Sequence, residues 1–155
     1  MDLNDVLSSG LAESLNALEA DIMILTHDLD VIFANSSYLT KVNLSLDEVI
    51  DSKCYALTHK QKSICHPPAD SCPIFAIDEH GNHGMEVHFH KTSSGQVNHV
   101  FVGANSFHYD GKKYFLHVAS KYIEDKAANK PDFHGIRELL DKALLDVRVN
   151  LAKYS

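Results

Sequence analysis

The sequence lacks the features that mark several classes of protein. Tryptophan is absent, and the longest uninterrupted apolar run, around Ile22–Leu25, is only a few residues long. A helix that spans a bilayer needs about 20 apolar residues, so no membrane insertion is expected. The N-terminus, Met1–Asp5, has neither a basic segment nor an apolar core, which excludes a recognisable secretion signal. We therefore expect a soluble, cytoplasmic protein.

Positive charge is scarce as well. The 155 residues include 14 Lys and Arg against 21 Asp and Glu, a formal net charge of -7. Binding to nucleic acid needs a basic face that neutralises phosphates, so no nucleic-acid partner is expected. The sequence contains no P-loop, no glycine-rich dinucleotide fingerprint and no nucleophile elbow. No catalytic residue is predicted, and the chain is not expected to be an enzyme.

Cysteine is rare and histidine is abundant. Three cysteines, an odd number, fit a disulfide framework poorly, and the cytoplasm keeps thiols reduced. Metal binding or redox chemistry is the better explanation for them. The 11 histidines strengthen a metal-linked or pH-linked role, because imidazole ligates metals and titrates near neutral pH.

The first half of the chain alternates helical and extended patterns. Leucines from Leu3 to Leu18 recur at three- and four-residue steps, which is a helical period. Ser45 and Glu48 have the spacing of a capping box, and Asn35 is followed by further cap residues. The expected elements are a helix over 3–18, strands over 21–26 and 31–34, short helices over 35–42 and 45–50, an irregular segment over 53–73 and a helical stretch over 74–79.

The second half begins with a change to a period of two. Apolar and polar residues alternate over 85–90, which predicts a strand with one apolar face and one exposed face bearing His88 and His90. Two more strands, over 97–107 and 113–123, flank an Asp-Gly hairpin turn. The isolated Gly103 indicates a bulge or the close approach of a ligand. A polar linker over 126–130 precedes an amphipathic helix from Phe133, whose apolar stripe is suited to docking on the sheet or pairing with a second copy.

This order of elements resembles that of a PAS domain, over about residues 19 to 124. Asp28, Ile32 and Asn35 resemble the hairpin that opens such domains. The resemblance implies an α+β fold, in which a five-stranded antiparallel sheet carries short helices on one face and helices flank it at both termini. We divide the chain into an N-terminal helix (1–19), a PAS sensor domain (20–124), and a linker with a C-terminal helix (125–155).

A second pattern is more specific. The segment Cys54-Tyr55 through His59, then Cys65, then Cys72-Pro73, followed by the H-x-H pair His88 and His90, resembles a cysteine-bearing PAS subgroup of bacterial sensor proteins. Such domains bind their ligand between the sheet and the short helices, where the cysteine segment would lie.

The cysteines and one histidine form a C-x4-H-x5-C-x6-C series made of Cys54, His59, Cys65 and Cys72. Three thiolates and an imidazole complete a tetrahedral site for soft metals, so we predict zinc or an iron–sulfur cluster there. The sensor context favours the cluster, whereas the ligand chemistry fits both. His88 and His90 are alternative or supporting ligands.

The predicted function is therefore a cytoplasmic signal-transduction module that senses redox state, oxygen or a related small ligand. We expect it to signal through a homodimer formed by the terminal helices and through a downstream domain or protein. Two alternatives remain open: a thiol-based redox protein without metal, and a cofactor-free dimerisation or interaction module.

Overall fold

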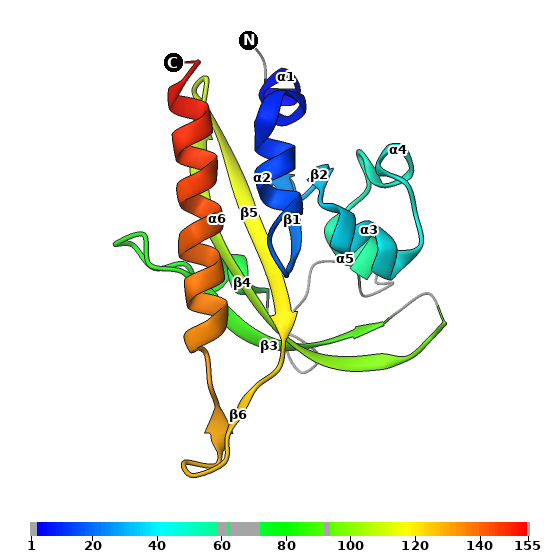
Figure 1. Cartoon of the computed structure of the whole chain (residues 1–155), viewed down its shortest axis with the longest axis vertical. Helices are drawn as coiled ribbons and strands as arrows, with labels where there is room; N and C mark the ends of the chain where they lie inside the picture. Colours follow the sequence, from blue (N-terminus) through cyan, green and yellow to red (C-terminus); the bar gives the residue numbers. More distant parts are fainter. Residues whose placement is uncertain (1–2, 59–61, 63–71, 92–93, 155) are drawn as a thin grey trace.

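The computed structural model describes residues 3–58, 62, 72–91 and 94–154, with the side chains of residues 9, 90 and 91 left out. These residues form a five-stranded antiparallel sheet in the order β2-β1-β5-β4-β3, with helices on both faces (Figure 1). The strands of this sheet are β1 (Asp21–Thr26), β2 (Val31–Ala34), β3 (Gly84–Lys91), β4 (Val97–Tyr109) and β5 (Lys112–Lys121). The expected α+β fold is confirmed.

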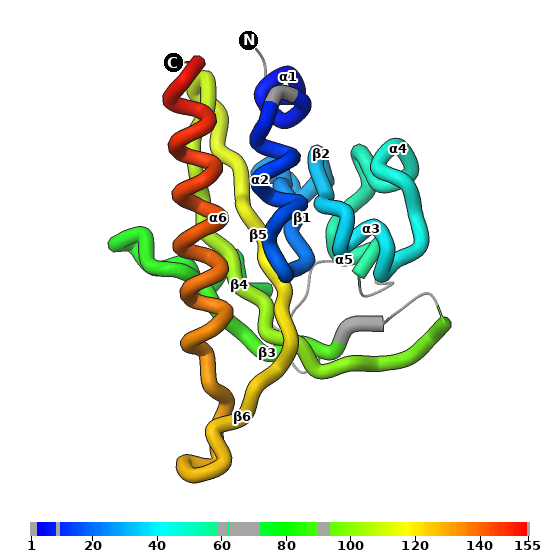
Figure 2. The backbone as a smooth tube through the Cα atoms, viewed as in Figure 1, coloured from blue at the N-terminus to red at the C-terminus, as the bar shows by residue number. Residues whose placement is uncertain are grey.

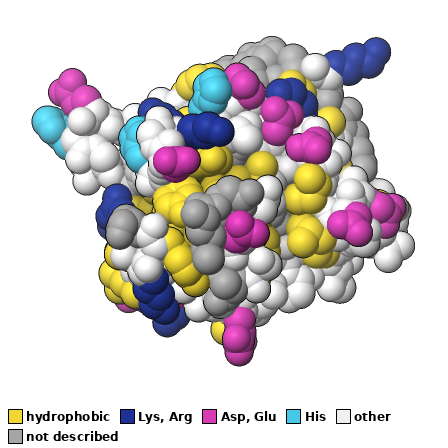
Figure 3. Space-filling model, turned by 90° about the horizontal axis from the view of Figure 1, so that it is seen from above, with side chains coloured by type: hydrophobic (Ala, Val, Ile, Leu, Met, Phe, Trp, Pro, Cys, Tyr) yellow, Lys and Arg dark blue, Asp and Glu magenta, His cyan; other side chains and the backbone are white. Residues whose placement is uncertain are grey.

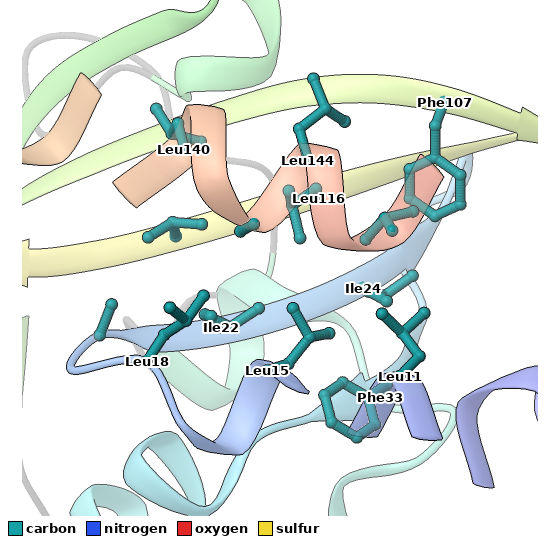
Figure 4. Close-up of a cluster of buried hydrophobic side chains, with 14 of the residues drawn as sticks. Leu11, Leu15, Leu18, Ile22, Ile24, Phe33, Phe107, Leu116, Leu140 and Leu144 are labelled. Atoms are coloured by element: carbon teal, nitrogen blue, oxygen red, sulfur yellow. The ribbon is translucent and has the colours of Figure 1, made fainter. Parts of the chain in front are cut away.

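One face of the sheet is covered by the two ends of the chain. The N-terminal helix consists of α1 (Leu3–Val6), a π-helical turn η1 (Leu7–Leu11) and α2 (Ala12–Asn16), and it lies beside the C-terminal helix α6 (His134–Ala152). Leucines from both helices interdigitate with Ile22, Ile24 and Leu116 of the sheet (Figure 4). We call this side the helix face.

The apolar stripe of α6 therefore docks on the chain's own sheet. Leu140 is fully buried and Leu144 nearly so. Gly103 of β4 lies beneath this helix, because a Cβ on it would come within 2.3 Å of a Leu140 methyl group. The strand register continues through Gly103 without a shift. The predicted bulge is wrong, and the group that approaches Gly103 closely is Leu140 of α6 and not a ligand.

The opposite face carries the short helices α3 (Ser36–Val42), α4 (Leu46–Val49) and α5 (Cys54–Thr58) together with the 3-10 turn η2 (Pro73–Ala76). We call it the cavity face. Both predicted caps are present, since Asn35 accepts a hydrogen bond from Tyr38 N and Ser45 forms a complete capping box with Glu48. Asn35 also donates from Nδ2 to the carbonyls of Leu15 and Ala20. It thus ties the end of the N-terminal helix to the sheet.

Three local predictions need correction. Residues 54–58 form a helix, not an irregular segment, because Leu57 packs into the core and its N–H bonds back to Lys53 O. The helical stretch expected over 74–79 is shorter and begins earlier, at Pro73, whose ring suits the first position of a helical turn. The linker predicted over 126–130 is the turn of a small hairpin formed by β6 (Glu124–Asp125) and β7 (Lys130–Pro131).

Both termini lie at the same end of the molecule (Figure 2). Seen from that end, hydrophobic side chains reach the surface between acidic and basic ones (Figure 3). Within the part of the chain that the structure describes, no helix is both long and apolar enough to cross a bilayer.

Candidate functional site

A small cavity lies on the cavity face, between the sheet and the segment that joins α5 to β3. Its volume is about 20 Å³, room for roughly one water molecule or one ion. Its lining combines thiol, imidazole and hydroxyl groups with apolar side chains, from Met23, Cys54, Tyr55, Thr58, Cys72, Pro73, Ile74, His88 and His117.

Cys54 is held at the cavity by contacts between the start of α5 and the first hairpin. Its backbone N–H donates to Leu29 O at 3.1 Å, and Asp30 forms an isolated bridge with Lys53. The ammonium of Lys53 lies 3.0 Å from the Asp30 carboxylate. Residues 29–30 therefore fix the register at which α5 begins, and so fix the position of the Cys54 side chain.

Cys72 is positioned by η2, which begins at the next residue. The start of β3 packs tightly on this turn, because a Cβ at Gly84 would lie 1.9 Å from Pro73 O. Only glycine allows that approach. Burial raises the pKa of the Cys72 thiol, and the nearby Glu86 carboxylate adds to the rise. The thiol is therefore protonated at neutral pH, unlike the reactive thiols of redox enzymes.

Tyr38 and Thr58 form a buried polar pair at the edge of the cavity. Their hydroxyl oxygens are 2.9 Å apart. Burial raises the pKa of Tyr38 to about 12, although the hydrogen bond to Thr58 works in the other direction. The phenol is thus a neutral hydrogen-bonding group beside Cys54, whose charge contributes to the same rise.

The structure places the predicted ligands only in part. Cys54 and Cys72 line the same cavity, although 17 residues separate them in the sequence. His59 and Cys65 lie outside the described residues, as does the side chain of His90. The prediction that His88 is exposed is wrong: it is 1% exposed and lines the cavity. Alternation over 85–90 predicts an exposed face only where one side of the sheet is solvated, whereas helices cover both faces of this sheet.

His117 is a cavity residue that sequence reasoning missed. It lies on β5 opposite Met23 of β1, is 8% exposed and lines the same cavity. A signal was present, because a histidine in the middle of the apolar run Phe115–Ala119 must be buried if the strand is central.

The described residues contain no group of three or more His, Cys, Asp or Glu side chains arranged to hold a metal ion. Cys54, Cys72, His88 and His117 share one cavity wall but do not by themselves form a coordination sphere in this structure. The donor types fit zinc or another soft metal, and completing the set would require residues such as His59 and Cys65.

A second polar cluster connects the cavity segment to α6. His83, which precedes β3, lies 2.6 Å through Nε2 from an Asp141 carboxylate oxygen on α6, and its Nδ1 is 2.9 Å from Nδ2 of Asn105. The short segment from Cys72 to His83 therefore reaches from the cavity to the helix on the other face.

No protein-family profile matches the sequence, and no curated protein does. Several solved structures, however, are similar to this chain. The PAS domain of nitrogen regulation protein NR(II) from Vibrio parahaemolyticus is 13% identical with a TM-score of 0.55, over 78% of this chain and 99% of that one. The PAS domain of an HTR-like protein from Haloarcula marismortui is 14% identical with a TM-score of 0.51, over 75% and 97%.

A LOV protein from Rhodobacter sphaeroides is 12% identical with a TM-score of 0.55, over 77% of this chain and 67% of that one. At such low identity these similarities show the fold alone. The chain has the fold of PAS and LOV domains.

Proposed function

We propose that this chain is the sensory input module of a signalling protein, and that it senses the gain or loss of a soft metal ion at the cavity. The fold supports the first part, because its structural neighbours include PAS domains of a nitrogen regulation protein and of a two-component sensor histidine kinase. The convergence of two thiols and two buried imidazoles on one ion-sized cavity supports the second.

The size of the cavity favours a single ion. Pockets for organic cofactors measure about 300–1,000 Å³, whereas this cavity measures about 20 Å³. An iron–sulfur cluster, which the sensor context favoured, would need the wall to open. We therefore propose zinc bound by Cys54 and Cys72, with His59 and Cys65 completing the set and His88 and His117 as further ligands or supporting groups.

A bound zinc ion would hold the thiolate forms of the cysteines and stabilise the fold without redox chemistry of its own. Because burial raises the pKa of Cys72, binding must release its proton, and affinity rises with pH. Thiolate ligands are also oxidisable, so occupancy responds to redox state. The alternative of a nucleophilic redox thiol is less suited to Cys72, whose thiolate form is disfavoured.

Signal transmission is proposed to follow the segment that begins at Cys72. η2 packs on the start of β3 through Gly84, and His83 contacts Asp141 of α6. A shift of Cys72 on metal binding would therefore reach α6, whose packing is the output toward a downstream domain or protein.

A homodimer would need a different surface from the predicted seam. Leu140 and Leu144 are buried in the chain's own core, whereas Leu145 and Val149 of α6 are 60% and 49% exposed. We propose that any pairing of copies uses this outer side of α6.

Purification without oxygen, followed by metal, sulfide and visible-absorption analysis, tests the metal site. We expect a colourless protein with one zinc ion per chain, which Cys54→Ser and Cys72→Ser lose. His27→Asn, at an exposed histidine outside the cavity, is the matched control and should keep the metal. Zinc affinity should rise between about pH 6 and 8 as the thiol proton is released.

Other outcomes would contradict the single-ion site. Brown protein with iron and sulfide would replace it with a cluster. Absence of metal, or equal metal in the wild type and Cys72→Ser, would leave a cofactor-free module or a thiol-based one.

A further inference from the structure

A polar groove runs along α6 on the side where Asp141 contacts His83, in the segment before β3. One part of it, of about 860 Å³, lies between the end of α6 and the β4–β5 hairpin. A second part, of about 500 Å³, lies further toward the start of the helix. The two parts share Gly81, Asn105 and Arg148 in their walls. The groove is distinct from the small cavity lined by Cys54 and Cys72, which lies on the other face of the sheet.

The only two arginines of the chain line this groove. Arg137 and Arg148 are 11 residues apart on α6, which places them on one side of the helix about 16 Å apart along its axis. Among the described residues, neither guanidinium forms an ion pair with a carboxylate. In an acidic chain, both of these planar, permanently charged donors therefore face an open groove.

Asp141, a carboxylate in the wall of the groove, already accepts a hydrogen bond from His83. Asn105, only 3% exposed, donates from Nδ2 to Gly81 O and to His83 Nδ1, both at 2.9 Å. This arrangement leaves the His83 Nε2 hydrogen to bond Asp141 at 2.6 Å. The imidazole is thus hydrogen-bonded to the Asp141 carboxylate. Together with the two bonds from Asn105, this contact fixes the shape of the groove wall.

The larger part of the groove adds flat apolar surface beside Arg148. Phe107, Tyr109, Leu151 and Tyr154 line it. Phe107 is itself held by stacking on Tyr114, with ring centroids 5.6 Å apart. Such side chains favour contact with a ring, and the volume lies within the range of small-molecule sites. The remaining carboxylate, Asp110, lies at the hairpin turn.

We infer that this groove binds a small aromatic oxyanion, a compound in which a planar ring carries a carboxylate or phosphate group. The Arg148 guanidinium offers a two-pronged set of donors that matches either group, and the ring packs against Tyr109 and Tyr154, which line the groove. Arg137 adds positive potential from the other end of the groove. The ligand would contact α6 directly, so, if α6 is the output helix as proposed above, it would act on that helix independently of the cavity at Cys54 and Cys72.

Phenyl phosphate and benzoate are the probes for this site, titrated into the full chain by calorimetry and amide NMR. We expect binding in the micromolar to millimolar range, with shifts at the amides of Asn105, Arg148 and Leu151. Arg148→Gln should weaken it at least about tenfold, because a charge-assisted pair is lost. Arg137→Gln should weaken binding by only about two- to threefold, because Arg137 lies at the other end of the groove and solvent screens its charge. The preferred probe identifies the anionic group.

Two further variants separate this site from general charge effects. Lys142→Gln removes the same charge from an exposed position of α6 outside the groove, and affinity should change by less than about twofold. Asp110→Asn should leave affinity unchanged or raise it. The inference is overturned if neither probe binds at about 5 mM, if Lys142→Gln and Arg148→Gln lose affinity equally, if Asp110→Asn weakens binding, or if inorganic phosphate binds as tightly as phenyl phosphate.

Discussion

The two faces of the sheet differ in what they bury. The helix face buries a large apolar cluster from the N-terminal helix, the sheet and α6, with the amide of Asn105 beside it. The cavity face buries thiol, imidazole and hydroxyl groups at Cys72, His88, His117 and Thr58. Apolar burial stabilises a fold, whereas buried polar groups stabilise it little unless they are well bonded or bind something.

This difference indicates a division of roles. The helix face carries the larger apolar cluster and the cavity face a smaller one, and the cavity face also keeps polar groups that a stability-optimised core would replace. The division is incomplete, because α6 belongs to the stable face and yet is the element that the segment from Cys72 reaches through His83. The following predictions test the comparison from its strongest consequence to its weakest.

Truncating a leucine on the helix face should have the largest effect. Leu140→Ala removes a fully buried side chain between α6 and β4, and we expect the free energy of unfolding to fall by about 3–4 kcal/mol. Leu145→Ala, on the same helix at a 60% exposed position, should change it by less than about 0.5 kcal/mol. Urea denaturation measures both. Similar losses in the two variants would mean that α6 does not pack on the sheet as described.

The sequence predicted this fold well where local physics decides the structure. The caps at Asn35 and Ser45 and the Asp-Gly turn are local devices. Asp110 and Gly111 do adopt the positive φ values, 52° and 74°, that a two-residue hairpin turn requires. Gly103 was predicted to mark a bulge or the close approach of a ligand, whereas the group that approaches it is Leu140 of a distant helix, which cannot be identified from one strand.

The site was predicted less completely, because burial on the cavity face is a tertiary property. Cys54 and Cys72 were proposed as ligands from their residue type and from the resemblance, and they line one cavity, whereas the roles of His59 and Cys65 remain predictions. His88 was assigned to solvent because nothing local shows that helices cover both faces of the sheet. The groove beside α6 depends on His83 and two arginines far apart in sequence, and no spacing rule connects them.

On the cavity face, the buried phenol of Tyr38 should make stability depend on alkaline pH. Its folded-state pKa of about 12 exceeds the unfolded value of about 10, so the folded state holds the proton more tightly. The associated stability is fully present below pH 10 and is lost as the pH rises toward 12. The loss amounts to about 2–3 kcal/mol.

Tyr38→Phe lacks this ionisation and provides the matched control. Unfolding free energies at about pH 9.5 and 11.5 should fall by about 2 kcal/mol more in the wild type than in the variant. Deprotonation of lysines and of Cys72 affects both proteins alike and cancels in the difference. Equal losses would show that the phenol is solvated and that this face is more open than the helix face.

The smallest expected effect concerns the contact that joins the two faces. His83 is 12% exposed and Asp141 is 67% exposed at the side chain, so solvent screens the pair and its worth is modest. A double-mutant cycle with His83→Ala and Asp141→Ala should give a coupling free energy of about 0.5–1 kcal/mol. His134 and Glu138 on the same helix form the matched control pair, 3.1 Å apart and 75% and 70% exposed. Their coupling should not exceed about 0.3 kcal/mol. If the two cycles give the same value, the His83 contact is an ordinary surface pair, and the route from Cys72 to α6 must run through the packing of η2 on β3 instead.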